Sequence, residues 1–161
     1  MSIKGEIRAA FKTALEHIAT TNTNSPIGTR SYLTDPTTVS DYVEGEIQVE
    51  EERRPYIGFI QAANGYKNGP QMFFECRDEM LIDVHCFARG HLDTVELIRA
   101  ELENMIEDVQ AAIARDIRLG GRVTFCLPVS KDDNEGKFNV VEGWARQRFR
   151  AVFHYSVRDF A

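Results

Sequence analysis

Apolar residues recur at intervals of three and four along residues 3–18, while charged side chains occupy the positions between them. This spacing places the apolar side chains on one face of a helix. Ser2 stands directly before the pattern and is a residue type that caps helix N-termini. We therefore expect an amphipathic helix near the start of the chain.

The same helical spacing returns between Val95 and Ile113, in the second half of the chain. The segment 93–96, Asp-Thr-Val-Glu, resembles a capping box. In such a motif an acidic N-cap accepts a hydrogen bond from a first-turn amide, and the side chain of the glutamate accepts one from the N-cap backbone N–H. Gly120 and Gly121 are expected to end this helix. Its expected length is roughly 35 Å at about 1.5 Å per residue.

Alternating apolar and polar residues predict strands elsewhere. A short apolar strand follows Pro55. The even-numbered positions of residues 72–86 are apolar except for Asp78, and the stretch is so long that we expect a bulge, bend or turn near residues 77–79. Further alternation predicts strands at three places. They are residues 43–49, the positions Val123, Phe125 and Leu127, and residues 144–157, where Phe149, Ala151, Phe153, Tyr155 and Val157 share one face.

Clusters of polar residues with Gly and Pro predict the connections between these elements. We expect extended loops at residues 20–41 and 63–71, and a polar loop at residues 130–137. No internal repeat or linker is apparent, so residues 1–161 are expected to form a single domain. An α+β fold, with a largely antiparallel or mixed β-sheet and two main helices packed on one face, would bury every apolar stripe at once.

The composition, 43% hydrophobic and 27% charged, is typical of a soluble globular protein. The net charge, 19 − 25 = −6, has the opposite sign to that of proteins that grip nucleic acid phosphates, which disfavours sequence-specific DNA binding. No apolar run approaches the roughly 20 residues of a membrane span, and residues 1–6 lack the apolar core of a signal peptide. We expect the chain to fold in a cytoplasm.

The three cysteines, Cys76, Cys86 and Cys126, are far apart and form no Cys-x-x-Cys pair. This pattern disfavours a disulfide framework or a zinc ribbon and predicts reduced, buried thiols. A metal site built from Cys76, His85, Cys86 and His91 is disfavoured, because the adjacent residues His85 and Cys86 should point to opposite faces of a strand. We expect no metal and no cofactor.

Residues 132–136, Asp-Asp-Asn-Glu-Gly, combine carboxylates with a glycine, as calcium loops do. The spacing does not match, because Gly136 falls at the fifth position instead of the sixth, so a solvated hairpin tip is the better interpretation. The sequence contains no Gly-x-Ser-x-Gly elbow and no glycine-rich phosphate loop that leads into a helix. No catalytic residue is therefore predicted.

Two patterns of charge remain, an acidic segment at residues 44–52 and a same-face row of arginines on the last strand. An ordinary solvated surface explains both about equally well. The functional interpretation is that the basic face of one subunit meets the acidic segment of its neighbour, in a heterologous contact that closes into a ring. The candidate residues for subunit or partner contacts are Arg146, Arg148, Arg150, Glu50, Glu51, Glu52, Asp132 and Asp133.

The order of the elements is distinctive: an amphipathic helix, a Pro-led strand at residues 55–60, a strand at 80–87 and a long helix at 94–114. An acidic hairpin at 131–136 and a closing strand at 144–155 follow. This order, over most of the chain, resembles the tail terminator or tail completion proteins of tailed bacteriophages, including the minor tail protein U type. Residues 20–41 and 66–77 are longer than in the compact family pattern.

The resemblance implies a structural virion protein, not an enzyme, at the tail–neck junction, assembled in the host cytoplasm. Such proteins form a ring, expected to be a hexamer, that caps the tail tube, ends tail polymerisation and joins the tail to the head. The implied partners are further copies of the chain, the tail tube protein, a neck or head-completion protein and, as a further candidate, the tail sheath. Genomic DNA would pass through the lumen without sequence-specific binding, which suits a net negative wall. No membrane partner is implied.

Two alternatives stay open. A neck or head-completion protein at the head–tail junction would share the same α+β ring logic, and the end of isolated tails that the protein occupies would separate the two. A small metal-dependent hydrolase would require a bound ion, which metal analysis of the pure protein would detect.

Overall fold

The computed structural model describes residues 2–23, 30–41, 54–62, 69–72, 75–89, 94–129, 135–138 and 143–156. These residues form two helices and seven strands. The helices are α1 (Ile3–Glu16) and α2 (Val95–Arg115). The strands are β1 (Thr38–Asp41), β2 (Tyr56–Ala62), β3 (Gly69–Met72), β4 (Glu75–Ala88), β5 (Phe125–Pro128), β6 (Glu135–Phe138) and β7 (Gly143–Ser156).

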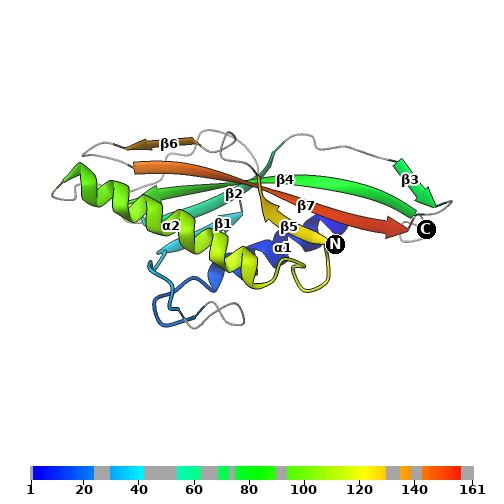
Figure 1. The fold of residues 1–161 in the computed structure, drawn as a ribbon, viewed down its shortest axis with the longest axis horizontal. Coiled ribbons are helices and arrows are strands. Elements are labelled where there is room, and N and C mark those ends of the chain that lie inside the picture. Colours follow the sequence, from blue (N-terminus) through cyan, green and yellow to red (C-terminus); the bar gives the residue numbers. More distant parts are fainter. Residues whose placement is uncertain are drawn as a thin grey trace.

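All the strands belong to one mixed sheet, and both helices pack on the same face of it (Figure 1). The strand order is β1-β2-β4-β7-β5, with β3 beside β4 and β6 beside β7. β1 runs parallel to β2, and the other pairs are antiparallel. The predicted α+β class, with two helices on one face of a mixed sheet, is confirmed. Within the described residues, no helix is both long and apolar enough to cross a membrane.

The centre of the sheet is the long pair formed by β4 and β7. Their register is continuous from Glu75 opposite Ser156 to Ala88 opposite Gly143. The bulge or turn predicted near residues 77–79 is therefore wrong, because β7 is long enough to pair with all of β4. The register shift lies instead in β3, between Pro70 and Met72.

The apolar stripes of both helices meet the apolar positions of β4 and β7 in a single core. Phe11 of α1 lies at its centre, with ring centroids 5.2 Å from Phe59 and 5.6 Å from Phe149. Burying a side chain of this size stabilises the fold by roughly 1.5–3 kcal/mol. The predicted N-cap of α1 is confirmed, since the backbone N–H of Gly5 donates to the Ser2 hydroxyl oxygen at 3.1 Å.

Helix α2 differs from its prediction at both ends. Its N-cap is Thr94, whose hydroxyl oxygen accepts from the N–H of Leu97 at 3.3 Å, so the predicted acidic N-cap one residue earlier is wrong. The helix ends at Arg115, before the two glycines, and its 21 residues give a length of about 32 Å. The Asp116 carboxylate accepts from the N–H of Gly120 at 2.7 Å and starts a turn there. Gly120 has φ +68°, a conformation that favours glycine.

Three predicted connections contain short strands. β1 occupies part of the predicted loop 20–41, β3 part of 63–71 and β6 part of 130–137. In β5 the predicted alternation is out of phase, because Cys126 is fully buried in the core while Leu127 is 45% exposed. The strand predicted at residues 43–49 lies outside the described residues.

Candidate subunit interface on the helix-free face of the sheet

The alternation of β7 separates its two sets of side chains. Phe149 and Ala151 are fully buried beneath the helices. Arg146, Arg148 and Arg150, called here the arginine row, lie on the opposite face, on which no helix of the described residues packs. We call this the helix-free face. The predicted same-face arrangement of the three arginines is confirmed.

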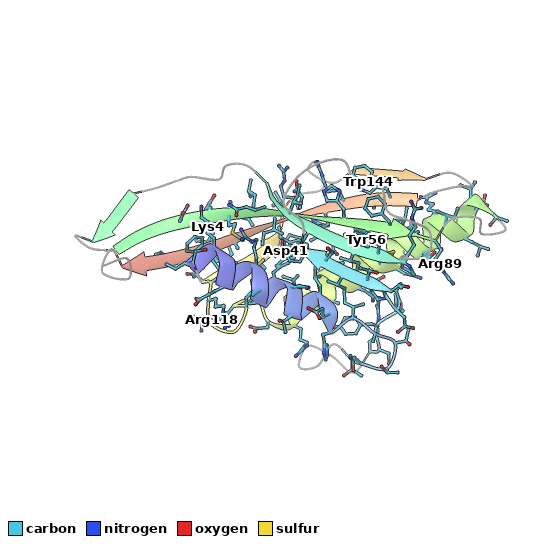
Figure 2. The ribbon with its side chains drawn as sticks, turned by 180° about the vertical axis from the view of Figure 1, so that it is seen from behind. Lys4, Asp41, Tyr56, Arg89, Arg118 and Trp144 are labelled. Atoms are coloured by element: carbon cyan, nitrogen blue, oxygen red, sulfur yellow. The ribbon has the colours of Figure 1, made fainter. Side chains whose placement is uncertain are left out.

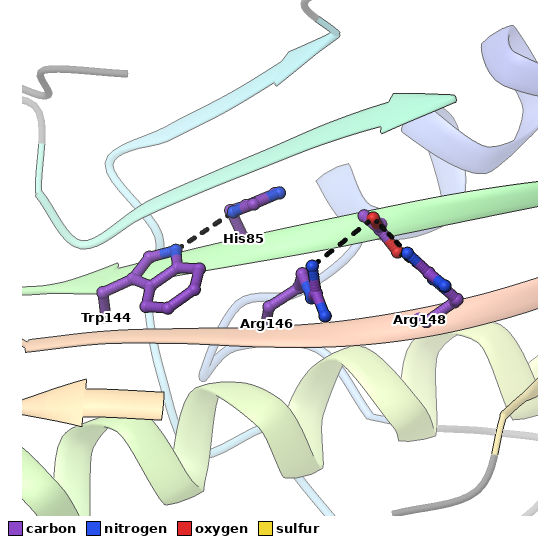
Figure 3. A network of polar contacts seen from close by, with 5 residues as sticks. His85, Trp144, Arg146 and Arg148 are labelled. Atoms are coloured by element: carbon purple, nitrogen blue, oxygen red, sulfur yellow. Dashed lines mark hydrogen bonds and ion pairs between the residues drawn. The ribbon is translucent and has the colours of Figure 1, made fainter. Parts of the chain in front are cut away.

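Two carboxylates of β4 lie among the arginines. Asp83 is directly opposite Arg148 in the register. The Arg148 guanidinium donates to both Asp83 oxygens, at 2.7 and 3.1 Å, and Arg146 Nη1 lies 4.0 Å from Asp83 Oδ2 (Figure 3). Two-point pairing of this kind is among the stronger and more directional ion pairs in proteins. Asp83 therefore holds this part of the arginine row against β4.

Arg150 has a looser arrangement. Its Nη1 lies 3.9 Å from Glu79 Oε1, and Nη2 of Arg77 lies at the same distance from that oxygen. These distances are too long for hydrogen bonds, and the Arg150 side chain is 48% exposed. Among the described side chains of β4 and β7, the helix-free face carries four guanidiniums and two carboxylates, 4 − 2 = +2. It can therefore attract an acidic partner.

An aromatic cluster lies beside the row, near the start of β7. Trp144 Nε1 donates to His85 Nδ1 at 3.0 Å, and the two ring centroids are 5.7 Å apart (Figure 3). Because an indole N–H can only donate, His85 Nδ1 is the acceptor of this bond. Tyr56 packs edge-on against Phe87, and the Arg54 guanidinium lies 5.8 Å from the Phe87 ring centroid. Tyr56 and Trp144 are at the same end of the sheet (Figure 2). His85 is half-buried.

The cysteines behave as small core residues. Cys86 and Cys126 are buried free thiols, as predicted for them. Burial raises the pKa of both thiols to about 12, with a smaller contribution from the Asp108 charge at Cys86. At neutral pH both are protonated and poor nucleophiles. The side chain of Cys76 is outside the described part of the structure.

Two of the residues considered as metal ligands lie on opposite faces of the sheet. Cys86 lies in the core, while His85 is on the helix-free face, so the predicted opposite orientation is confirmed. Within the described ranges, no three His, Cys, Asp or Glu side chains are grouped so that they could hold a metal ion. His91 and the acidic residues Asp132 and Asp133 lie outside those ranges, as do Glu50, Glu51 and Glu52.

Two buried polar contacts were missing from the sequence interpretation. The Asp108 carboxylate of α2 is buried and accepts from the Leu33 and Thr34 N–H groups and the Thr34 hydroxyl, at 2.6–3.0 Å. Gln147, on the core side of β7, accepts from the side-chain amide of Gln110 at 2.7 Å. In the sequence, each of these contacts is indicated by a polar residue that stands at a position where the apolar stripe predicts a buried side chain.

Neither a protein-family model nor a curated protein matches this chain.

Proposed function

We propose that this protein is a tail terminator of a tailed bacteriophage. It would assemble into a ring, expected to contain six copies, on the end of the tail tube, stop tube growth and offer a surface to the neck of the head. The observation that supports this best is the order of elements: α1, the Pro-led β2, β4, the long α2 and β7 occupy the positions on which the resemblance rests.

The surface chemistry adds support. A closed ring needs two different contact surfaces on each subunit, because its contacts are heterologous. The helix-free face carries an excess of two positive charges among its described side chains on β4 and β7, whereas residues 44–52 contain five glutamates. Opposite charges on two surfaces favour head-to-tail association and fix its orientation.

The arginines also contribute to the subunit itself. Arg148 is held by Asp83 within the same chain, so the row is not simply a patch of loosely placed cations. Arg150 is the member of the row with the most exposed side chain. We therefore assign contact with an acidic neighbour mainly to Arg150, and the positioning of the strand pair mainly to Arg148.

The test combines microscopy of the purified protein with tube assembly. We expect closed rings by negative stain and a single oligomer by native mass spectrometry at micromolar concentration. Added to polymerising tail tube protein of the same phage, the rings should shorten the tubes and occupy one tube end. A protein that stays monomeric at every concentration and leaves tube length unchanged would contradict the proposal. Binding to the neck side of filled heads, but not to tubes, would favour the head-completion alternative.

A further inference from the structure

The outer edge of β5 is closed to further strands. The Cys126 N–H donates to the Ile117 carbonyl at 2.7 Å, so the chain that precedes β5 already covers this edge. Pro128 has no N–H to offer. A proline and a covering loop are the usual means by which proteins protect an edge strand from unwanted pairing.

Beyond β5, the same edge of β7 lacks a paired strand within the described residues, although Thr124, just before β5, contacts His154 there through side chains, with Oγ1 3.0 Å from Nδ1. Two β7 carbonyls, those of Arg148 and Val152, accept from backbone N–H groups on the β5 side at 2.9 and 2.7 Å. Backbone groups of even-numbered residues therefore face this edge, and His154 and Ser156 continue the series. No strand of the described residues lies beside them there, because β5 pairs with β7 only as far as Val152.

This end of β7 projects from the body of the molecule. In Figures 1 and 2, β4 and β7 continue beyond the first turn of α1, where Lys4 is labelled, and β3 flanks them. Lys4 contacts β4 at Asp78, 3.8 Å away, so residues 75–77 and their partners 154–156 extend past the helix. At about 3.4 Å per residue, the projecting part is roughly 10 Å long.

Within the described residues, a second edge without a paired strand lies at the other side of the sheet. β1 is the first strand in the order, and β2 is its one neighbour in the described part of the chain. It is a short strand of four residues without proline or lysine. Of the common means of protecting an edge strand, β1 has its short length and the charged Asp41, but no proline or lysine.

We infer that these two edges join subunits: β1 of one copy pairs with residues 154–156 of the next, so that the sheet continues from subunit to subunit. This inference rests on the proposed ring and deepens it. The edges lie on opposite sides of one sheet, so the same contact can repeat around a closed ring. If β1 of one copy paired with β1 of another, both copies would use the same edge, and assembly through this contact would stop at a dimer.

Charge favours a second copy of this chain as the occupant. Asp41 is the last residue of β1 and lies 3.6 Å from Arg8 of its own chain, and Asp35 precedes the strand and accepts from Thr20. The sequence that follows Asp41 adds five glutamates up to residue 52, so this side of the subunit is acidic overall. Arg77 of β4 lies opposite His154, and Arg150 lies four residues before His154 on β7, with side chains 40% and 48% exposed. The pairing therefore brings the acidic side of one subunit to the basic side of its neighbour.

Cysteine pairs test this geometry directly. In a Cys76→Ser background, Ser40→Cys and Ser156→Cys are introduced together and treated with a short bismaleimide, whose reach tolerates a small shift in register. Cys86 and Cys126 are buried and should not react. We expect a ladder of covalent oligomers that ends at the size of the ring. An equal mixture of the two single variants should give dimers, because each joined pair uses one cysteine from each chain.

The matched control moves one cysteine to the closed edge. Leu127→Cys with Ser40→Cys should give no ladder, since β5 is covered. Independently, Ser156→Pro removes an outward N–H at the end of β7 and should lower the ring population at least tenfold, while Ser156→Ala leaves it unchanged; circular dichroism reports the fold of each. Rings seen by microscopy without a ladder in the double variant would overturn edge pairing and leave the tail terminator proposal standing. A parent protein that forms no rings and fails to cap tubes would overturn both.

Discussion

At the scale of single residues, Asp108 connects α2 to the chain that leads into β1. Asp108 is 1% exposed, and its carboxylate accepts hydrogen bonds from three groups, the backbone N–H groups of Leu33 and Thr34 and the Thr34 hydroxyl. These residues precede a four-residue edge strand that has little apolar surface of its own. The position of β1 therefore depends on a carboxylate that lies on the neighbouring helix.

Replacing Asp108 with Asn tests this dependence. The amide has nearly the same shape, but it turns one acceptor into a donor that faces N–H groups. We expect the free energy of unfolding to fall by about 1–3 kcal/mol. Urea denaturation followed by circular dichroism measures the change. Glu103→Gln, which alters a 65% exposed carboxylate on the same helix, should change it by less than about 0.5 kcal/mol. Equal effects of the two substitutions would contradict the anchoring role.

The buried thiols make the stability of the fold depend on alkaline pH. Burial raises the Cys126 pKa from an ordinary 9.0 to about 12, so between these values the native protein keeps a proton that the unfolded chain has lost. Stability is therefore fully present below pH 9 and decreases as pH rises. For one thiol the loss between pH 8 and pH 10 is about 1 kcal/mol.

A Cys126→Ala variant should show less of this alkaline loss. The difference in unfolding free energy between pH 8 and pH 10 is expected to be smaller than in the parent by about 1 kcal/mol. Val123→Ala, a nearby buried substitution without a titrating group, should lower stability at both pH values and leave the pH dependence unchanged. An unchanged slope in Cys126→Ala would contradict the assignment of the loss to this thiol.

At the scale of elements, the contact between α2 and the start of β7 depends on Gly143. A Cβ at this position would lie 2.5 Å from Ile98 Cγ2 and 3.0 Å from Leu102 Cδ1. Real Cβ contacts of 2.5 Å do not occur, so the Ile98 side chain or the helix that carries it would have to shift. The missing side chain therefore sets how closely the helix packs on the sheet.

We expect Gly143→Ala to destabilise the protein by about 1–3 kcal/mol through overpacking. Thermal and urea unfolding measure the effect. Ile98→Ala also destabilises, because it leaves a cavity, yet it makes room for the added methyl group. The double variant should therefore lose less than the sum of the two single variants. If the losses in unfolding free energy of the two single variants add up to that of the double variant, the added methyl group does not clash with Ile98.

The same scale shows what could be predicted from the sequence. The stripes of α1 and α2 and the alternation of β4 and β7 recur over many residues, so their identity and buried faces were predictable. β1, β3 and β6 have four residues each, too few for a period to appear. Local sequence also cannot give register. The arginine row could be predicted from the sequence of β7, but its contacts with Asp83 and Glu79 depend on the register between β4 and β7.

At the scale of the whole molecule, opposite charges are separated along the chain. The net charge is −6, yet the described side chains of β4 and β7 on the helix-free face carry an excess of two positive charges. Such an arrangement attracts copies of the same chain to one another over about one Debye length, roughly 8–10 Å at physiological salt. Ring assembly through this face should therefore weaken as salt concentration rises.

Reversing the charge of one arginine at a time separates the effect on folding from the effect on assembly. Arg148→Glu places a second carboxylate against Asp83, which is 4% exposed, and should cost about 3 kcal/mol or more. Arg150→Glu removes a half-exposed charge 3.9 Å from its partner and should cost less than about 1 kcal/mol. Reversing all three arginines together would combine both effects, so the single variants are the informative ones.

The expected result for Arg150→Glu is a folded subunit with impaired assembly. Its unfolding transition should stay close to that of the parent, while the concentration at which rings form, measured by sedimentation velocity, rises at least tenfold. Because the substitution removes an attraction that salt also screens, the salt dependence of assembly should become weaker than in the parent. Arg150→Gln should fall between the two, since it removes the charge without reversing it. Rings that form at the parent's concentration in Arg150→Glu would exclude this arginine from the interface and leave the row with a role in the fold alone.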